Sequence, residues 1–115
     1  MKQKVHSVSY LAKAEFELKN GVYDLVALPT GAEVVRVSLA IAGTPKGGNV
    51  SVGIKDESKE LFLARSITQS SFTSDRDYTA TSNKVVMAEV EGSNDDTKCV
   101  LRVLYFLPSV IEVEY

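Results

Sequence analysis

The chain has 115 residues, with 13 Lys and Arg, 15 Asp and Glu, and a formal net charge of −2. This length fits one domain over residues 1–115. The basic residues are scattered, which argues against nucleic-acid binding, since phosphate contacts select clustered cations. A single cysteine, Cys99, excludes an internal disulfide. No apolar run follows the N-terminal lysines or approaches the length of a membrane span, so we expect neither a signal peptide nor a transmembrane segment.

Two strand patterns precede a hairpin signal near the N-terminus. Residues 5–10 and 14–18 are predicted to form separate strands. Asn20-Gly21 then predicts a tight turn, because Asn-Gly is strongly favoured in two-residue hairpin loops. We therefore expect a strand over 22–28 to fold back on the strand before it.

The clearest strand pattern lies at 33–42, after a predicted turn at Pro29-Thr30-Gly31. Every second residue is apolar, which predicts one face packed on a core: Val35, Val37, Leu39 and Ile41. Val34 is out of step with this alternation, as are Val8 and Val110 in their own segments. These three valines predict a second apolar surface for a partner subunit.

The middle of the chain alternates between strands and polar segments. A glycine-rich loop at 43–49 precedes a strand at 50–55. Residues 56–65 fit either one helical turn or a short strand. Residues 69–83 are rich in Ser and Thr, which predicts a long surface loop.

The last third of the chain predicts three further strands, at 84–91, 99–107 and 111–115, with a turn cluster at 91–97. The 99–107 segment is apolar almost throughout, which is typical of a central strand covered on both faces. About eight strands and no convincing helix predict an all-β fold, namely an antiparallel β-sandwich of jelly-roll type.

No arrangement of residues favours catalysis, a cofactor or a metal. The single histidine, His6, is the only imidazole base, and Cys99 lies in the most apolar segment, where a thiol behaves as a small hydrophobic group. The acidic groups at 75–77 and 94–96 are typical of turns and lack the spacing of a Ca²⁺ loop. We therefore predict no enzyme activity, no cofactor and no bound metal.

Three residues are predicted to make contacts with a partner or a ligand. Arg102 interrupts an apolar strand, where a charge must be paired, exposed to solvent or placed at a subunit interface. Phe72 and Tyr78 stand out within the polar 69–83 segment. They either contact a ligand, such as a host-surface glycan, or anchor the segment to the core.

Three segments of the chain resemble small virion proteins of tailed bacteriophages. They are Tyr23–Val35, with a Leu-Pro-x-Gly-Ala turn before a Val-rich strand, Val50–Asp56, with a Val-Gly-x-x-Asp strand end, and the closing Val-rich strand Cys99–Leu107. The chain differs from these proteins in its extension after Pro108 and in its long Ser/Thr loop. The matching positions define the fold, so no functional residue is carried over.

The resemblance implies a non-enzymatic structural protein of the virion, made in the host cytoplasm. Its expected role is capsid decoration, or a component of a head fibre or tail fibre. Its expected partners are further copies of itself, as a homo-oligomer such as a trimer, and other virion proteins. Exposed sheet edges favour the same reading, because closed symmetric assembly covers them.

The alternative is a carbohydrate- or cell-surface-binding β-sandwich module, with the 69–83 segment or the acidic turns as its contact region. Such a module would be expected to depend on Ca²⁺. An enzyme of the jelly-roll type is a weaker hypothesis, because those enzymes use several His and Glu ligands and this chain has one histidine.

Overall fold

The computed structural model describes residues 2–5, 8–43, 47–107 and 111–114, and within them the side chains of all but 2–5, 94–96 and 111–114. His6 and Val110, which the sequence singled out, lie outside the described residues. The described part of the molecule extends 56 × 25 × 18 Å along its principal axes.

Every regular element in the described residues is a β-strand, and none of these residues forms a helix that could cross a membrane. The strands are β1 (Lys2–Val5), β2 (Val8–Leu28), β3 (Glu33–Ile41), β4 (Asn49–Ile54), β5 (Leu63–Ser66), β6 (Ser71–Ser74), β7 (Tyr78–Thr79), β8 (Lys84–Leu107) and β9 (Ile111–Glu114). The predicted all-β class is confirmed.

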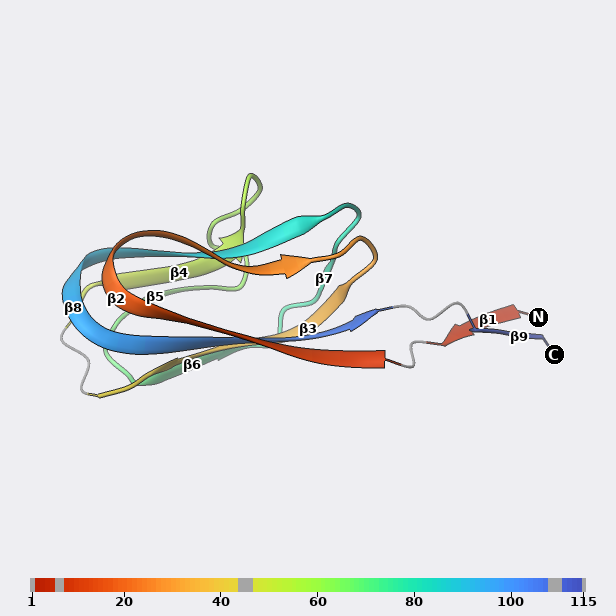
Figure 1. The fold of residues 1–115 in the computed structure, drawn as a ribbon, viewed down its shortest axis with the longest axis horizontal. Helices are drawn as coiled ribbons and strands as arrows, with labels where there is room; N and C mark the ends of the chain where they lie inside the picture. The colour runs from red at the N-terminus through yellow and green to blue at the C-terminus, as the bar shows by residue number, and fades with distance from the viewer. Residues whose placement is uncertain (1, 6–7, 44–46, 108–110, 115) are drawn as a thin grey trace.

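Two long strands, β2 and β8, pair antiparallel and pass together through two layers (Figure 1). Layer A consists of β5, β4 and the paired segments 84–91 of β8 and 21–28 of β2. Layer B consists of the paired segments 8–17 of β2 and 98–107 of β8, followed by β3 with β6 and β7. One seven-stranded sheet thus folds over on itself, which confirms the predicted antiparallel, jelly-roll-like sandwich.

The layers are joined at a corner where β2 and β8 bend side by side, at the left of Figure 1. The step from Glu17 to Gly21 in β2 is matched by the step from Val90 to Lys98 in β8, which is twice as long. The longer segment follows because β8 runs on the outside of the bend and takes up the extra residues as bulges.

Local hydrogen bonds satisfy the backbone of this corner. The Ser93 amide donates to the side-chain oxygen of Asn20 at 2.9 Å, and the buried Ser93 hydroxyl donates to the Leu18 carbonyl at 3.3 Å. Asn20-Gly21 therefore does not form the predicted hairpin, and the predicted turn cluster at 91–97 is also wrong. Both segments stay within strands because β2 and β8 run side by side through the bend and pair with each other on both sides of it.

The predicted turn at Pro29-Thr30-Gly31 is confirmed and leads into β3. The Ala32 amide donates to the Pro29 carbonyl at 3.1 Å, and Gly31 has φ 90°, a conformation that L side chains rarely adopt. The Gly31 amide donates to the Ala80 carbonyl at 2.7 Å, and the Thr30 amide to the Asn83 side chain at 3.1 Å. The turn is thus held by the segment that precedes β8.

A bulge in β3 changes which valine faces the core. Val37, Leu39 and Ile41 are buried as the alternation predicts. The register shifts between Val34 and Arg36, so Val34 is also buried, at 1% exposure, while Val35 is only partly buried. The prediction that Val34 forms an outer apolar surface is therefore wrong, because a bulge reverses the alternation on one side of it.

Pairing with neighbouring strands decides the structure of two segments, 56–65 and 69–83. The 56–65 segment forms a turn, with Asp56 at φ 65°, and then enters β5. The predicted long loop at 69–83 is wrong in part, because β6 and β7 form within it and both pair with β3.

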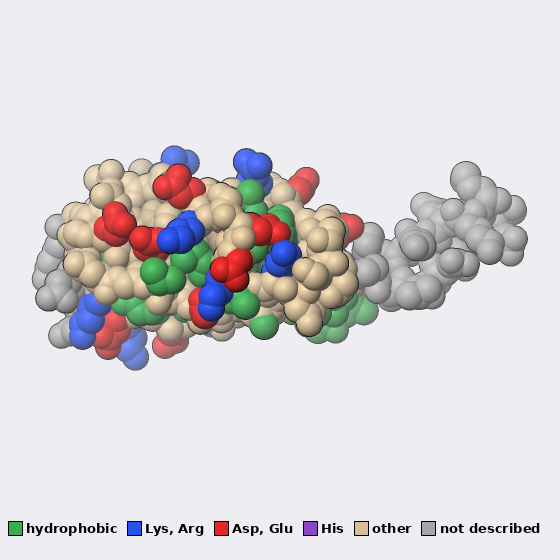
Figure 2. Space-filling model, turned by 90° about the horizontal axis from the view of Figure 1, so that it is seen from above, with side chains coloured by type: hydrophobic (Ala, Val, Ile, Leu, Met, Phe, Trp, Pro, Cys, Tyr) green, Lys and Arg blue, Asp and Glu red, His purple; other side chains and the backbone are tan. Residues whose placement is uncertain are grey.

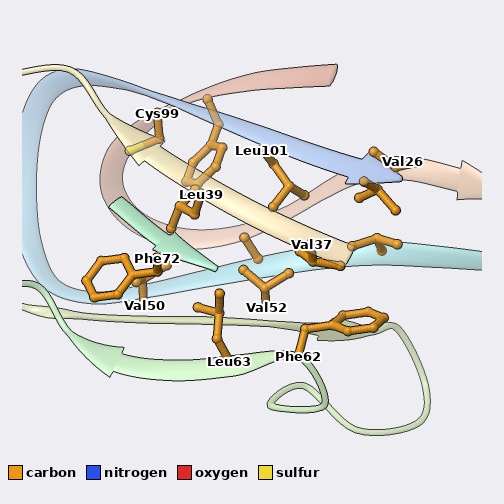
Figure 3. Packing of buried hydrophobic residues seen from close by; sticks show 14 of the residues in the cluster. Val26, Val37, Leu39, Val50, Val52, Phe62, Leu63, Phe72, Cys99 and Leu101 are labelled. Atoms are coloured by element: carbon orange, nitrogen blue, oxygen red, sulfur yellow. The ribbon is translucent and has the colours of Figure 1, made fainter. Parts of the chain in front are cut away.

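The core lies between the two layers (Figure 3). Its buried side chains come from layer A, including Val26, Val50, Val52 and Leu63, and from layer B, including Val37, Leu39, Phe72, Cys99 and Leu101. Cys99 is fully buried and forms no disulfide, as its apolar segment predicts.

The two remaining strands, β1 and β9, form a two-stranded ribbon that projects beyond the sandwich (Figure 1). Their antiparallel register places Lys2 opposite Glu114 and Lys4 opposite Glu112. A two-stranded ribbon alone is marginally stable in water, so contact with another surface would stabilise this β1–β9 arm.

Candidate functional site

Arg102 lies at the centre of layer B, and its side chain projects from the outer face. Leu101 and Val103 on either side of it are fully buried, so the alternation of β8 directs Arg102 away from the core. The even-numbered residues of this segment are only partly buried. The prediction of a central strand is confirmed by its position between β2 and β3, but the prediction that both faces are covered is wrong for the chain by itself.

The cross-strand neighbour of Arg102 on β2 is another cation, Lys13, and on β3 it is Ser38. Neither Lys13 nor Arg102 makes an ion pair or side-chain hydrogen bond with any residue that the structure describes. Like charges directly opposite each other on paired strands destabilise a sheet. Lys13 and Arg102 are called the cation pair below.

Toward the arm, the same two strands carry apolar side chains on both faces. Val8, Tyr10 and Leu11 of β2 are 39%, 43% and 59% exposed. Their partners on β8 are partly buried, and the rings of Tyr10 and Tyr105 stack with centroids 5.4 Å apart. We call this region the apolar end; it consists of Val8, Tyr10, Leu11, Leu104, Tyr105, Phe106 and Leu107.

The β2 segment of the apolar end is also an open sheet edge. Residues 8–17 pair with β8 on one side, and no described strand pairs with them on the other. An exposed edge strand with apolar side chains is a template for association with another chain. Hydrophobic side chains are visible in Figure 2 at this end of the body, beside the grey terminal residues.

The outer face of layer A differs, because its charges are paired within the chain. Lys55 lies 2.7 Å from Asp24, Lys59 lies 3.6 Å from Glu89, and Figure 2 shows cations and anions side by side on this face. An open groove of about 520 Å³ runs over β4, β5 and β8, with Ser51, Ser66 and Glu91 in its lining.

Phe72 and Tyr78, the predicted ligand contacts, both contact other parts of the chain. Phe72 is 9% exposed and belongs to the core. The Tyr78 ring meets Phe62 edge-on at 6.2 Å, and its hydroxyl donates to Glu57 at 3.0 Å. These contacts match the anchoring role that the sequence also allowed. Contact with a ligand stays a prediction for both residues.

Tyr78 belongs to a small polar network at the start of β8. Burial and the hydrogen bond to Glu57 raise the pKa of Tyr78 to about 12. Glu57 also pairs with Lys84 at 2.7 Å, and the hydrogen bonds from Lys84 and Tyr78 hold the pKa of the Glu57 carboxyl below its ordinary value. The network fastens the 56–62 loop to β7 and β8.

Other predicted sources of chemistry are dispersed. Asp75 pairs with Arg36 at 3.1 Å, and the side chains of 94–96 lie outside the description. Among described residues, no three His, Cys, Asp or Glu side chains gather as metal ligands would.

Sequence reasoning identified Arg102 but missed Lys13, Tyr10 and Leu11. Their importance depends on the register with β8, and the only local signal was the partial alternation of 8–17.

Solved phage capsids contain chains of the same fold. A chain of the cyanophage Pam1 capsid asymmetric unit is 21% identical with a TM-score of 0.67, over 87% of this chain and 85% of that one. A chain of the Ralstonia phage GP4 capsid is 18% identical with a TM-score of 0.67, over 91% and 88%.

A much stronger similarity shows the family. A chain in the acidic stable capsid structure of Helicobacter pylori bacteriophage KHP30 is 62% identical, with a TM-score of 0.89, and the match covers 100% of both chains. The chain belongs to the same family as this phage capsid chain and is a structural protein of a phage virion. The predicted resemblance to phage virion proteins is confirmed at that level. No protein-family model and no curated protein matches the chain.

Proposed function

We propose that the chain is a non-enzymatic component mounted on a phage capsid, as a decoration protein or as part of a head or tail fibre. It assembles there as a homo-oligomer, with a trimer as the expected form. The observation that carries this proposal is the apolar end, which a soluble monomer would leave in water. Membership in a family of phage capsid chains supports the same conclusion.

The apolar end fits a second copy of the chain as its occupant. Each Val, Leu or Phe side chain that moves from water into an interface contributes about 1.5–3 kcal/mol. If the copies are related by a rotation that closes a ring, each copy also covers the open β2 edge of its neighbour. The adjoining β1–β9 ribbon extends from the same end and enlarges the surface that a neighbouring copy can cover.

The test is the solution mass of the purified protein, by light scattering behind size exclusion, with and without Ca²⁺. We expect a discrete oligomer that is indifferent to Ca²⁺. Leu11→Glu should weaken association by about tenfold or more, from the lost burial alone. Val22→Glu is the matched control, because Val22 is 57% exposed against 59% for Leu11 but lies at the corner.

Two results contradict the proposal. A wild-type monomer at every concentration would exclude a homo-oligomer of the free protein. Equal masses for both variants and the wild type would show that association does not use the apolar end.

A host-surface glycan remains a second candidate partner, favoured by one feature of the 69–83 segment. An open groove of about 510 Å³ lies between β5 and β6, and Gln69, Ser71 and Thr73 line it together with Phe72. Polar side chains that line an open groove suit the hydroxyl groups of a sugar. Binding to a glycan array that Thr73→Trp abolishes by filling the groove would support this role, and an array with no bound glycan would remove it.

A further inference from the structure

We propose that the outer face of layer B around the cation pair docks on another virion protein, at an acidic and partly apolar surface of the capsid shell. In the docked state, Arg102 and Lys13 bind a carboxylate of that protein. This inference rests on the proposed function, because it assumes that the chain is mounted on a capsid.

The first argument is the charge arrangement across the two strands. Directly opposite residues of an antiparallel pair hold their Cβ atoms about 4.5–5.5 Å apart, a distance at which like charges repel. Arg102 is partly buried, so its charge is screened less by solvent and salt than that of a fully exposed arginine. An anion placed between the two cations removes the repulsion and gains charge-assisted hydrogen bonds from both.

The second argument is that nearby acids do not supply this anion. Asp75 is paired with Arg36, and Glu17 lies 3.0 Å from Lys19. Glu15 shares the outer face but stands two residues along β2 from Lys13, opposite Val100. In the structure, Glu15 makes no ion pair with Lys13 or Arg102, although both lie within reach of its side chain. The face therefore keeps a net positive centre in a chain whose overall charge is −2.

The third argument is the apolar surround, which selects a protein surface as the occupant. Val100 of β8 and its cross-strand neighbour Ala40 of β3 lie beside the cation pair and outside the apolar end, and Ser38 on β3 is small. A central arginine within partly buried apolar residues is the composition of a protein–protein interface. Nucleic acid would instead require several spaced cations without apolar neighbours.

The same face of a second copy is a poor occupant. It would bring two cation pairs together, and the repulsion would then be doubled instead of removed. On the outer face of layer A, Asp24 and Glu89 are poor candidates as well, since both are already paired within the chain. These arguments favour a carboxylate from a different protein over one from a second copy.

The experiment measures binding of the purified protein to phage capsid shells that lack it, by co-sedimentation over a range of NaCl concentrations. Arg102→Glu and Lys13→Glu are compared with Arg65→Glu, the reversal of an exposed arginine on β5 of layer A. We expect Arg102→Glu to weaken shell binding by about thirtyfold or more. Arg102→Lys should retain part of the affinity, because it keeps the charge and loses the two-pronged hydrogen bond.

The control variant Arg65→Glu should bind as the wild type does, and wild-type binding should weaken as NaCl rises. The oligomer mass of each variant, measured in parallel, should equal that of the wild type. Arg102 projects from the outer face, so its replacement leaves the core in place, and a cooperative thermal transition confirms that each variant is folded.

The outcomes separate this inference from the proposed function. Wild-type protein that binds shells, with Arg102→Glu and Lys13→Glu binding equally well, overturns the inference and leaves the capsid role standing. Wild-type protein that never binds shells overturns the capsid role and the inference together. Retention on duplex DNA that Arg102→Glu abolishes, without retention on shells, would replace the protein partner by a nucleic acid.

Discussion

The two outer faces of this sandwich are built from the same two strands, yet only one of them is completed within the chain. On layer A, Asp24 of β2 and Glu89 of β8 meet lysines from the 55–59 segment. On layer B, Lys13 of β2 and Arg102 of β8 face each other without a described counter-ion. This difference is the basis for the proposal that a partner completes layer B.

The cause of this difference is the 56–62 loop. It folds back over β4, where the Ile54 amide donates to the Ser58 carbonyl at 2.8 Å, and it brings Lys59 to Glu89. Met87, the register neighbour of Gly53 on the outer face, is 1% exposed. Layer B has no such covering segment among the described residues, so its apolar side chains stay at the surface.

The largest expected effect comes from removing the cover of layer A. A Cβ atom at residue 53 would collide with the Ser58 carbonyl and the Lys59 backbone, so Gly53→Val should displace the loop and cost about 3 kcal/mol of stability. Urea denaturation measures the change, with Ser51→Ala on the same face of β4 as the control. A loss no greater than that of the control would show that the loop does not rest on β4.

The next effect concerns the corner that joins the two layers. Asn20→Ala would remove the acceptor of the Ser93 amide and leave that amide without its partner. We expect a loss of about 1–2 kcal/mol in the free energy of unfolding. Asn20→Asp keeps an acceptor oxygen and should lose less. Equal stability of the alanine variant and the wild type would mean that the hydrogen bond does not hold the bend.

A pH dependence is expected from the network that fastens the loop of layer A. Because the pKa of Glu57 is lowered in the folded chain, its contribution to stability is present above the ordinary value of 4.5 and is lost as pH falls through the lower, folded value. As pH falls below 4.5, the melting temperature of the wild type should therefore decline more steeply than the melting temperature of Glu57→Gln. Parallel curves for the two proteins would contradict this assignment.

The smallest effect has opposite signs on the two faces. Lys13→Gln removes a like-charge contact and should raise the stability of the free chain by about 0.2–0.5 kcal/mol. Lys59→Gln removes a salt bridge whose lysine is largely exposed and should lower stability by about 0.2–0.5 kcal/mol. Paired urea titrations measure both changes. If Lys13→Gln lowered stability instead, Lys13 would have a favourable partner within the chain. The contrast drawn between the two faces would then be wrong.

Much of the secondary structure was predictable because it depends on local patterns. The alternation after Val35, the glycine at the 29–31 turn and the apolar 99–107 segment each correspond to an observed element. The burial of Cys99 also followed from its own segment. These features need only the period of a strand and the conformational preference of glycine.

The sequence by itself determined that this protein is an all-β sandwich with Arg102 in an exceptional position on a central strand. The tertiary structure alone decided that Asn20-Gly21 bends a continuous strand, that a bulge turns Val34 inward, and that Lys13 stands opposite Arg102. Each of these depends on the register between strands far apart in the chain. Register is set by the packing of the whole sheet, so no local pattern contains it.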